Sequence, residues 1–179
     1  MYDEVGYDKL TTALALPDGG VVLGGYSDSP SSGNKKTAVY GGNDYFLVNL
    51  DQNGAKRGLQ CVGGTGDDRL RSLLLTKEGG YLLGGNSDSP KTNDPLGLTY
   101  PYKSRSSRGQ NFWIVKLNAM GGKEWDLTTG GTGSEYLSSA LPTPDGGYLL
   151  GALLTHRRIL TISQILLNMV PTGEPITGW

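Results

Sequence analysis

Short apolar runs alternate with glycine-bounded turns along most of the chain. In the middle of the chain, RLRSLLLT at residues 69–76 and YLLGG at residues 81–85 flank the turn KEGG. Further on, NFWIVKL at residues 111–117 and KEWDLTT at residues 123–129 flank a second turn, NAMGG. Short runs rich in aliphatic and aromatic residues and bounded by glycine are typical of β-strands, and paired glycines supply the positive φ of tight hairpins. We therefore predict four antiparallel strands in this unit.

The unit is repeated. Residues 63–85 and 130–152 are identical at fourteen of 23 positions, at a constant offset of 67. An earlier copy, starting near Gly6, matches the second at an offset of 60 before the long loop and 67 after it, so seven extra residues fall in the loop between residues 87 and 110. The strands predicted for the earlier copy are 10–16, 21–25, 44–50 and 56–62. A period of this size indicates a stacked or ring-like array of one supersecondary unit.

These repeats divide the chain into four parts. The parts are repeat 1 at 1–64, repeat 2 at 65–131, a partial repeat 3 at 132–152, and a tail at 153–179. Four short antiparallel strands in each unit, with no helix in either complete repeat, predict an all-β fold of β-propeller-like blades. Phe46 and Trp113 hold equivalent places in the third strand and are expected to pack between neighbouring blades.

The number of repeats is too small for a closed propeller. Propellers close with about four to eight blades, whereas this chain carries an incomplete array of about 2.5 repeats. Two and a half blades would leave edges and inter-blade faces exposed. We therefore expect either a fragment of a longer protein or an oligomer that completes its ring with other copies. An open β-solenoid of stacked hairpins is the alternative architecture.

The tail departs from the repeat after Leu150. Where a polar loop and an aromatic strand are due, the chain reads LLTHRRILTISQILLNMVPTGEPITGW. Three explanations stay open: a reading-frame error in the gene, a segment that caps the last sheet edge, or a binding function. Five apolar residues of the tail fall at helical spacing, so an amphipathic helix is one expectation. They are Ile162, Ile165, Leu166, Met169 and Val170.

Composition narrows the class of protein. The net charge of −1 argues against a nucleic-acid or anionic-membrane partner. The single cysteine, Cys61, excludes an intrachain disulfide, and no run reaches the roughly 18 apolar residues of a membrane span. Because residues 1–5 have neither a basic start nor an apolar run, the expectation is a cytoplasmic protein or an internal piece of a longer one.

No catalytic residues are predicted. A Ser/His/Asp system needs a histidine oriented by a carboxylate, and the only histidine, His156, stands in the tail beside two arginines. A nucleophilic cysteine needs a nearby base. The residue equivalent to Cys61 in the next repeat is Thr128. We therefore interpret Cys61 as a small strand residue and not as a nucleophile.

No metal site is predicted either, and calcium is kept as an alternative. DQNG at residues 51–54 resembles the opening of a calcium loop, which needs oxygen ligands at alternating positions. The equivalent NAMG at residues 118–121 keeps only the asparagine and the glycine, which favours a hairpin turn. Residues 66–68, Asp28 and Asp88 could offer oxygen ligands, although Asx-turns are the commoner use of such residues.

The long loop of repeat 2 carries the candidate ligand-binding residues. They are Tyr100, Tyr102, Lys103, Arg105 and Arg108. Tyrosines beside basic residues suit sugar stacking or an acidic protein partner. Binding residues often lie on loops held by a rigid scaffold. A merely solvated loop is the alternative.

Several linked motifs resemble a known group of repeats. DKLTTALALPDGGVVLGGYSDSP, NDYFLVNLDQNGAK, NFWIVKLNAMGGKEWDLTTGGTG and YLSSALPTPDGGYLLG resemble the tandem repeats of large exported proteins of Bacteroidota. Those proteins often end in a type IX secretion sorting domain. The resemblance covers residues 6–151 and implies a β-propeller-like fold, a secreted or cell-surface location and no catalytic residues. The chain departs from the group in its repeat number and its tail.

These observations predict a non-enzymatic β-propeller-like repeat module of a secreted or cell-surface protein that binds a protein or a glycan. No nucleic acid, membrane span or cofactor is expected. One alternative is a scaffold fragment of a propeller hydrolase or lyase whose active site lies outside this chain. Another is a cytoplasmic scaffold that oligomerises.

Overall fold

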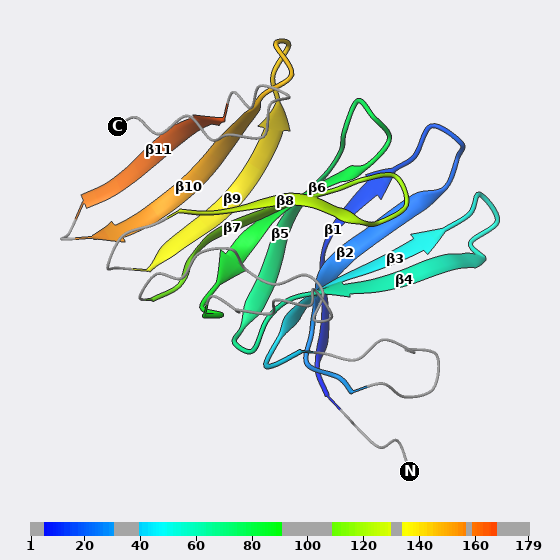
Figure 1. Ribbon diagram of the computed structural model, residues 1–179, viewed down its shortest axis with the longest axis horizontal. Helices are drawn as coiled ribbons and strands as arrows, with labels where there is room; N and C mark the ends of the chain where they lie inside the picture. The colour runs from blue at the N-terminus through cyan, green and yellow to red at the C-terminus, as the bar shows by residue number, and fades with distance from the viewer. Residues whose placement is uncertain (1–5, 31–39, 91–108, 130–133, 157–158, 168–179) are drawn as a thin grey trace.

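The protein consists of three antiparallel β-sheets that follow one another in chain order. The computed structural model describes residues 6–30, 40–90, 109–129, 134–156 and 159–167. These ranges hold eleven strands and no helix. Figure 1 shows the sheets arranged along the long axis of the molecule, with the first and third at opposite ends. The predicted all-β fold of four-stranded antiparallel units is confirmed for the two complete repeats.

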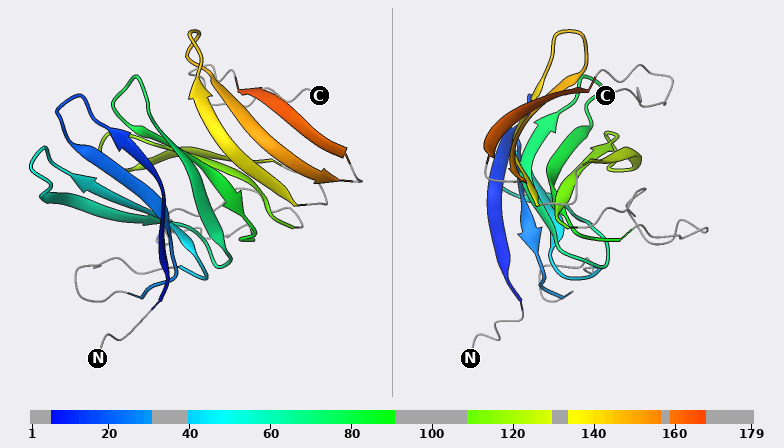
Figure 2. Two further views of the ribbon diagram at one scale, coloured as in Figure 1. Left: turned by 180° about the vertical axis from the view of Figure 1, so that it is seen from behind. Right: turned by 90° about the vertical axis from the view of Figure 1, so that its left-hand side faces the viewer.

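Each sheet is named here by its place in the chain. Sheet 1 has the order β1 (Asp8–Ala15), β2 (Val21–Ser27), β3 (Asp44–Leu50), β4 (Lys56–Val62). Sheet 2 has the order β5 (Asp68–Leu75), β6 (Tyr81–Ser87), β7 (Asn111–Leu117), β8 (Lys123–Thr129). Sheet 3 has the order β11 (Ile159–Leu167), β10 (Tyr148–His156), β9 (Glu135–Pro142). The β1–β2, β5–β6 and β9–β10 turns lie on the same side of the molecule (Figure 2).

The register repeats as closely as the sequence does. Leu23 faces Val48 across β2 and β3, and the equivalent Leu83 faces Val115 across β6 and β7. The first strand of each complete sheet also shifts register at the same place, between Leu10 and Thr12 in sheet 1 and at the equivalent point in sheet 2. Sheet 2 is therefore a copy of sheet 1 down to its irregularities.

The helical expectation for the tail is wrong. Ile162, Ile165 and Leu166 lie in β11, which pairs antiparallel with β10 in the place of a third strand. Met169 and Val170 lie outside the described residues. The segment ILTISQILL is rich in β-branched residues, and pairing with it satisfies the backbone groups along an otherwise open edge of β10. Tertiary pairing thus overrides the helical spacing.

Sheets 1 and 2 pack face to face around two aromatic side chains. The rings of Tyr45 and Trp113 lie 5.1 Å apart between centroids at a tilt of 41°, a favourable geometry for an aromatic pair. The Tyr45 hydroxyl donates a hydrogen bond to the Trp113 carbonyl oxygen at 2.9 Å. The buried residues around them include Val22, Leu47, Val62, Leu70, Leu73, Leu83, Val115 and Leu117.

A second core lies between sheets 2 and 3. Its buried residues are Leu82, Phe112, Ile114, Leu137, Ala140, Tyr148 and Leu150, with Leu74, Trp125 and Leu127 packed against them. Successive side chains of a strand point to opposite faces of the sheet. Trp113 therefore packs against sheet 1, and its neighbour Phe112 packs against sheet 3.

The expected packing between sheets is confirmed for Trp113 but not for Phe46. Phe46 is half-buried and lies between Tyr45 and Leu47, both of which face sheet 2. By strand alternation it lies on the opposite face of sheet 1. The physical reason is that no described sheet precedes sheet 1 to pack against that face.

The register shift in β1 leaves no room for a side chain at Gly25. A Cβ built on Gly25 would lie 1.9 Å from the carbonyl oxygen of Lys9. The equivalent Gly85 would meet the carbonyl oxygen of Arg69 at 2.1 Å. Gly58 in β4 is the contrast, since a Cβ there would meet no atom within 4 Å.

We expect Gly25→Ala to destabilise the protein by about 2 kcal/mol or more, because the backbone of β1 would have to move. Gly58→Ala should leave stability unchanged or raise it by about 0.5 kcal/mol, because alanine loses less backbone entropy on folding. Urea unfolding of both variants beside the wild-type protein measures the difference. Equal stability of the two variants would contradict the close approach at Gly25.

The buried hydroxyl of Tyr45 should make the fold sensitive to alkali. Burial raises the pKa of Tyr45 well above its ordinary value, and the nearby negative charge of Asp68 adds to the effect. Above about pH 10 the tyrosine of the unfolded chain loses its proton while the folded one keeps it, so stability falls as the pH rises.

We expect Tyr45→Phe to reduce this alkaline loss. The variant should cost about 1 kcal/mol at neutral pH, because the hydrogen bond to Trp113 is gone. Its free energy of unfolding should then fall less steeply than that of the wild-type protein above pH 10. Urea unfolding at a series of pH values from 8 upward tests this, with parallel curves below pH 9 as the internal control.

Candidate functional site

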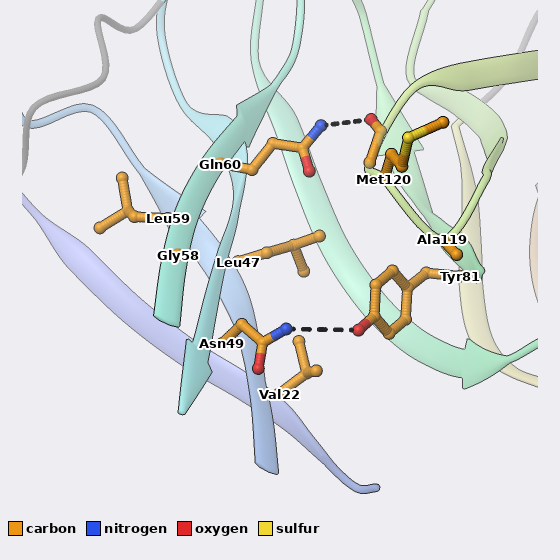
Figure 3. A pocket seen from close by; sticks show the side chains of 10 residues that line it. Val22, Leu47, Asn49, Gly58, Leu59, Gln60, Tyr81, Ala119 and Met120 are labelled. Carbon is orange, nitrogen blue, oxygen red and sulfur yellow. Dashed lines mark hydrogen bonds between the residues drawn. The ribbon is translucent and has the colours of Figure 1, made fainter. Parts of the chain in front are cut away.

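The described residues form a cleft between sheets 1 and 2, with a volume of about 340 Å³ (Figure 3). Pockets that hold small ligands have volumes of about 300–1,000 Å³, so this cleft is at the small end of that range. Its lining residues are Val22, Leu47, Asn49, Gly58, Leu59, Gln60, Tyr81, Ala119, Met120 and Gly121.

Each wall of the cleft comes from a different sheet. On one side stand β3 and β4 of sheet 1, and on the other stand the start of β6, with Tyr81, and the β7–β8 turn of sheet 2. Val22 and Leu47 are buried core residues and give the cleft an apolar floor. Met120, at the tip of the turn, is 93% exposed. Figure 3 shows the side chain of Leu59 pointing away from the cleft.

The cleft lies where the two sheet interfaces differ most in side-chain volume. Gly58 and Gln60 of β4 correspond, at the offset of 67, to Trp125 and Leu127 of β8. Trp125 and Leu127 pack against the core between sheets 2 and 3. Glycine leaves that volume empty between sheets 1 and 2. Sequence reasoning missed this site, although the exchange of glycine for tryptophan at one offset was the available signal.

Side-chain amides line the cleft. Asn49 Nδ2 donates to the Tyr81 hydroxyl over a long 3.5 Å, and Gln60 Nε2 donates to the Gly121 carbonyl oxygen at 2.8 Å. The Oδ1 atom of Asn49 is buried and accepts no hydrogen bond from the described residues. A buried acceptor without a donor is costly.

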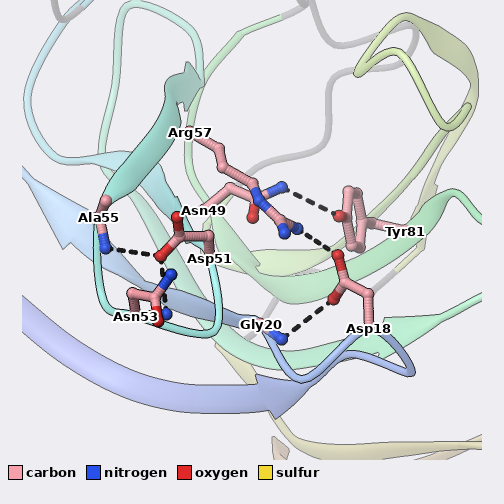
Figure 4. A network of polar contacts seen from close by, with 8 residues as sticks. All are labelled: Asp18, Gly20, Asn49, Asp51, Asn53, Ala55, Arg57 and Tyr81. Carbon is pink, nitrogen blue, oxygen red and sulfur yellow. Dashed lines mark hydrogen bonds and ion pairs between the residues drawn. The ribbon is translucent and has the colours of Figure 1, made fainter.

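A charged pair stands beside the Tyr81 end of the cleft (Figure 4). Arg57 donates to the Asp18 carboxylate, and both side chains are about half exposed. This hydrogen bond and a second from the Gly20 backbone N–H, at 3.0 Å, hold the pKa of Asp18 below its usual range. Burial raises the pKa of Tyr81, and the charge of Asp18 adds to it while Arg57 opposes it. Tyr81 is thus a neutral hydroxyl at physiological pH.

The turn between β3 and β4 is held by Asp51. Its carboxylate accepts the backbone N–H groups of Asn53 and Ala55, each at 2.8 Å. In the equivalent turn, the Asn118 side-chain oxygen accepts the N–H groups of Met120 and Gly122 at 2.9 and 2.8 Å. Residues 51–54 therefore form a hairpin turn closed by a side chain, as the sequence comparison favoured.

The other aspartates that sequence reasoning singled out bind backbone groups. Asp28 accepts the N–H of Tyr7, and the equivalent Asp88 accepts the N–H of Asp67 at 2.6 Å. Asp67 accepts the backbone and side-chain N–H groups of Asn43 at 2.9 and 2.8 Å, which lower its pKa. In the described part of the chain, no group of three or more His, Cys, Asp or Glu is placed to hold a metal ion. Calcium binding stays an alternative prediction.

The candidate residues of the long loop all lie outside the described residues. They are Tyr100, Tyr102, Lys103, Arg105 and Arg108. Cys61 is buried in β4 opposite Phe46. His156 ends β10.

No protein-family model matches the chain, and no curated protein matches it. Among the residues that the structure describes, there is no helix long and apolar enough to cross a membrane.

We expect Gly58→Trp to fill the cleft without disturbing the fold. Space is open around a Cβ at this position, and β8 accommodates Trp125 at the equivalent place. The added indole would bury its own apolar surface in the cleft, so thermal stability should equal or exceed that of the wild-type protein. Far-UV circular dichroism and the unfolding midpoint measure this outcome. A loss of β-structure would show that the volume at Gly58 is already occupied.

Proposed function

We propose that this chain is a non-enzymatic, β-propeller-like repeat module of a secreted or cell-surface protein, and that it binds a glycan in the cleft between sheets 1 and 2. The cleft is the observation that carries the proposal. In sheet 1 this place holds Gly58 and Gln60, where the equivalent positions of sheet 2 hold Trp125 and Leu127.

The succession of sheets supports the propeller-like arrangement. The first strand of sheet 2, β5, packs against sheet 1, and the first strand of sheet 3, β9, packs against sheet 2 in the same manner. Each sheet has four antiparallel strands where the repeat is complete, with consecutive strands adjacent. Blades of a propeller have this construction. The exported location is supported by the resemblance of residues 6–151 to Bacteroidota repeats alone.

The chemistry of the cleft favours a glycan over other ligands. Tyr81 presents a ring that is apolar on its face and carries a polar hydroxyl. Asn49 and Gln60 supply planar amides that both donate and accept hydrogen bonds, and the Asp18–Arg57 pair lies beside them. Neighbouring hydroxyls of a sugar need paired donors and acceptors of this kind, while the C–H face of the sugar needs an apolar surface.

Two other functions remain as alternatives. A scaffold of a propeller hydrolase or lyase would bind nothing in this cleft, because its active site would lie elsewhere. A cytoplasmic oligomerising scaffold would likewise have no need of the cleft.

A protein partner in place of a glycan is favoured by one feature, the 93% exposed Met120 at the rim of the cleft, because methionine is common at adaptable binding surfaces.

The test is binding to an immobilised panel of oligosaccharides, with a panel of peptides beside it. We expect the wild-type chain to bind at least one glycan and Gly58→Trp to lose about tenfold or more in affinity, since the indole fills the cleft. Gly58→Ala, which leaves most of the cleft open, is the matched control and should bind like the wild-type protein.

Three outcomes would contradict the proposal. Binding to peptides alone would replace the glycan by a protein partner. Glycan binding that Gly58→Trp leaves unchanged would place the ligand elsewhere on the chain. Binding to neither panel would favour the scaffold alternatives.

A further inference from the structure

The outward face of sheet 1 carries the apolar side chains that sheet 2 buries at the equivalent positions. Leu10 is 60% exposed, whereas its equivalent Leu70 is fully buried against sheet 1. Leu23 and Val48 are half-buried, whereas Leu83 and Val115 are fully buried in the first core. The face that packs one sheet onto the preceding sheet is thus present in sheet 1, where no described sheet precedes it.

The register shows that these residues share one face. Directly opposed residues of paired strands lie on the same side of a sheet. The row that faces sheet 1 from sheet 2 is Leu73, Leu83 and Val115, and the equivalent row in sheet 1 is Ala13, Leu23 and Val48. The outward face of sheet 1 is therefore built to the same plan as a face known to pack on a sheet.

The outward face of sheet 3 carries exposed apolar side chains whose equivalents in sheet 2 pack on the following sheet. Leu141 is 57% exposed and lies opposite Leu149, which is half-buried. Their equivalents, Leu74 and Leu82, belong to the core between sheets 2 and 3. Tyr136 is also exposed, at 38%, and strand alternation places it on this outward face. The outward face of sheet 3 thus carries the same apolar residues with which sheet 2 packs on sheet 3.

We propose that copies of this chain associate head to tail, with the outward face of sheet 1 of one copy packed on the outward face of sheet 3 of another. A second copy is the favoured occupant because this chain carries both halves of the interface, each related by the repeat to one already formed within it. Exposed apolar faces of this kind mark interaction sites in soluble proteins.

The symmetry of the contact sets the possible assemblies. Two different faces meet, so the contact is heterologous and either closes into a ring or continues as a filament. Two copies carry six sheets, counted over the described residues, and propellers close with about four to eight blades. The association does not depend on the ligand of the cleft, which lies inside each copy.

The test measures the molar mass of the full chain by size-exclusion chromatography with light scattering, up to about 100 µM, where a micromolar complex is saturated. The wild-type protein should form a dimer or a longer head-to-tail species. Leu10→Glu and Leu141→Glu should each weaken association about tenfold or more, because each puts a charge in an apolar contact. Both side chains are more than half exposed, so both variants should keep the wild-type circular dichroism.

Mixing the two variants gives the decisive measurement. Leu10→Glu keeps an intact sheet 3 face and Leu141→Glu keeps an intact sheet 1 face, so an equimolar mixture should form a dimer at a concentration at which each variant alone is mostly monomeric. Met120→Glu is the matched control: it changes an exposed apolar side chain of the cleft, so it should associate like the wild-type protein and can fail only in ligand binding.

Three results would overturn the proposal. The first is a monomeric wild-type protein at the highest concentration. The second is association of Leu141→Glu alone with Leu10→Glu monomeric, which would mean that sheet 1 packs on sheet 1. The third is association that neither variant weakens. None of these results bears on glycan binding in the cleft, which Gly58→Trp tests separately.

Discussion

The fold depends on burying each sheet against the next one. A single sheet must bury its apolar face against another element to form a core, and one of this size is at best marginally stable alone. Here the contact between sheets 1 and 2 is centred on Tyr45 and Trp113. Their rings pack together while the tyrosine hydroxyl reaches the tryptophan carbonyl, so burial and a directional bond act at one point. Because Tyr45 spans the interface, its hydrogen bond and its ring contact together hold the two sheets in one relative position.

The interface between sheets 2 and 3 is built on the same plan as the one between sheets 1 and 2, but different side chains fill it. Between sheets 2 and 3, Phe112 takes the place of Tyr45, and Trp125 fills the outer part of the contact. Between sheets 1 and 2, the tyrosine hydrogen bond secures the inner part while Gly58 leaves the outer part hollow. The interface between sheets 1 and 2 is therefore held together by the Tyr45 contacts, while its rim is not filled by side chains. A cavity that a close-packed interior would fill persists because the stabilising contacts lie elsewhere.

The sequence was sufficient to predict the strands of the two complete repeats but not what they face. The repeat offsets and the glycine turns predicted β3, β4, β7 and β8 at their observed bounds, because the same kinds of turn residue recur in each repeat. The cleft was missed, since it depends on which strand faces which across two sheets. A helix was one expectation for the tail because a short run of isoleucine and leucine fits both periods. Residues 159–167 form a strand instead, because they pair with the open edge of β10.

The two ends of the array follow from the same repetition. A repeated unit must carry both faces of its own interface, one for the unit before it and one for the unit after it. In this chain Leu10 and Leu141 are the visible consequence, for each is exposed where its equivalent in sheet 2 is buried or packed against the core. The tail strand β11 pairs with β10 and extends sheet 3 along the direction of its hydrogen bonds. It leaves the outward face of β9 as it was, so the apolar faces at the two ends persist as a consequence of building by repetition.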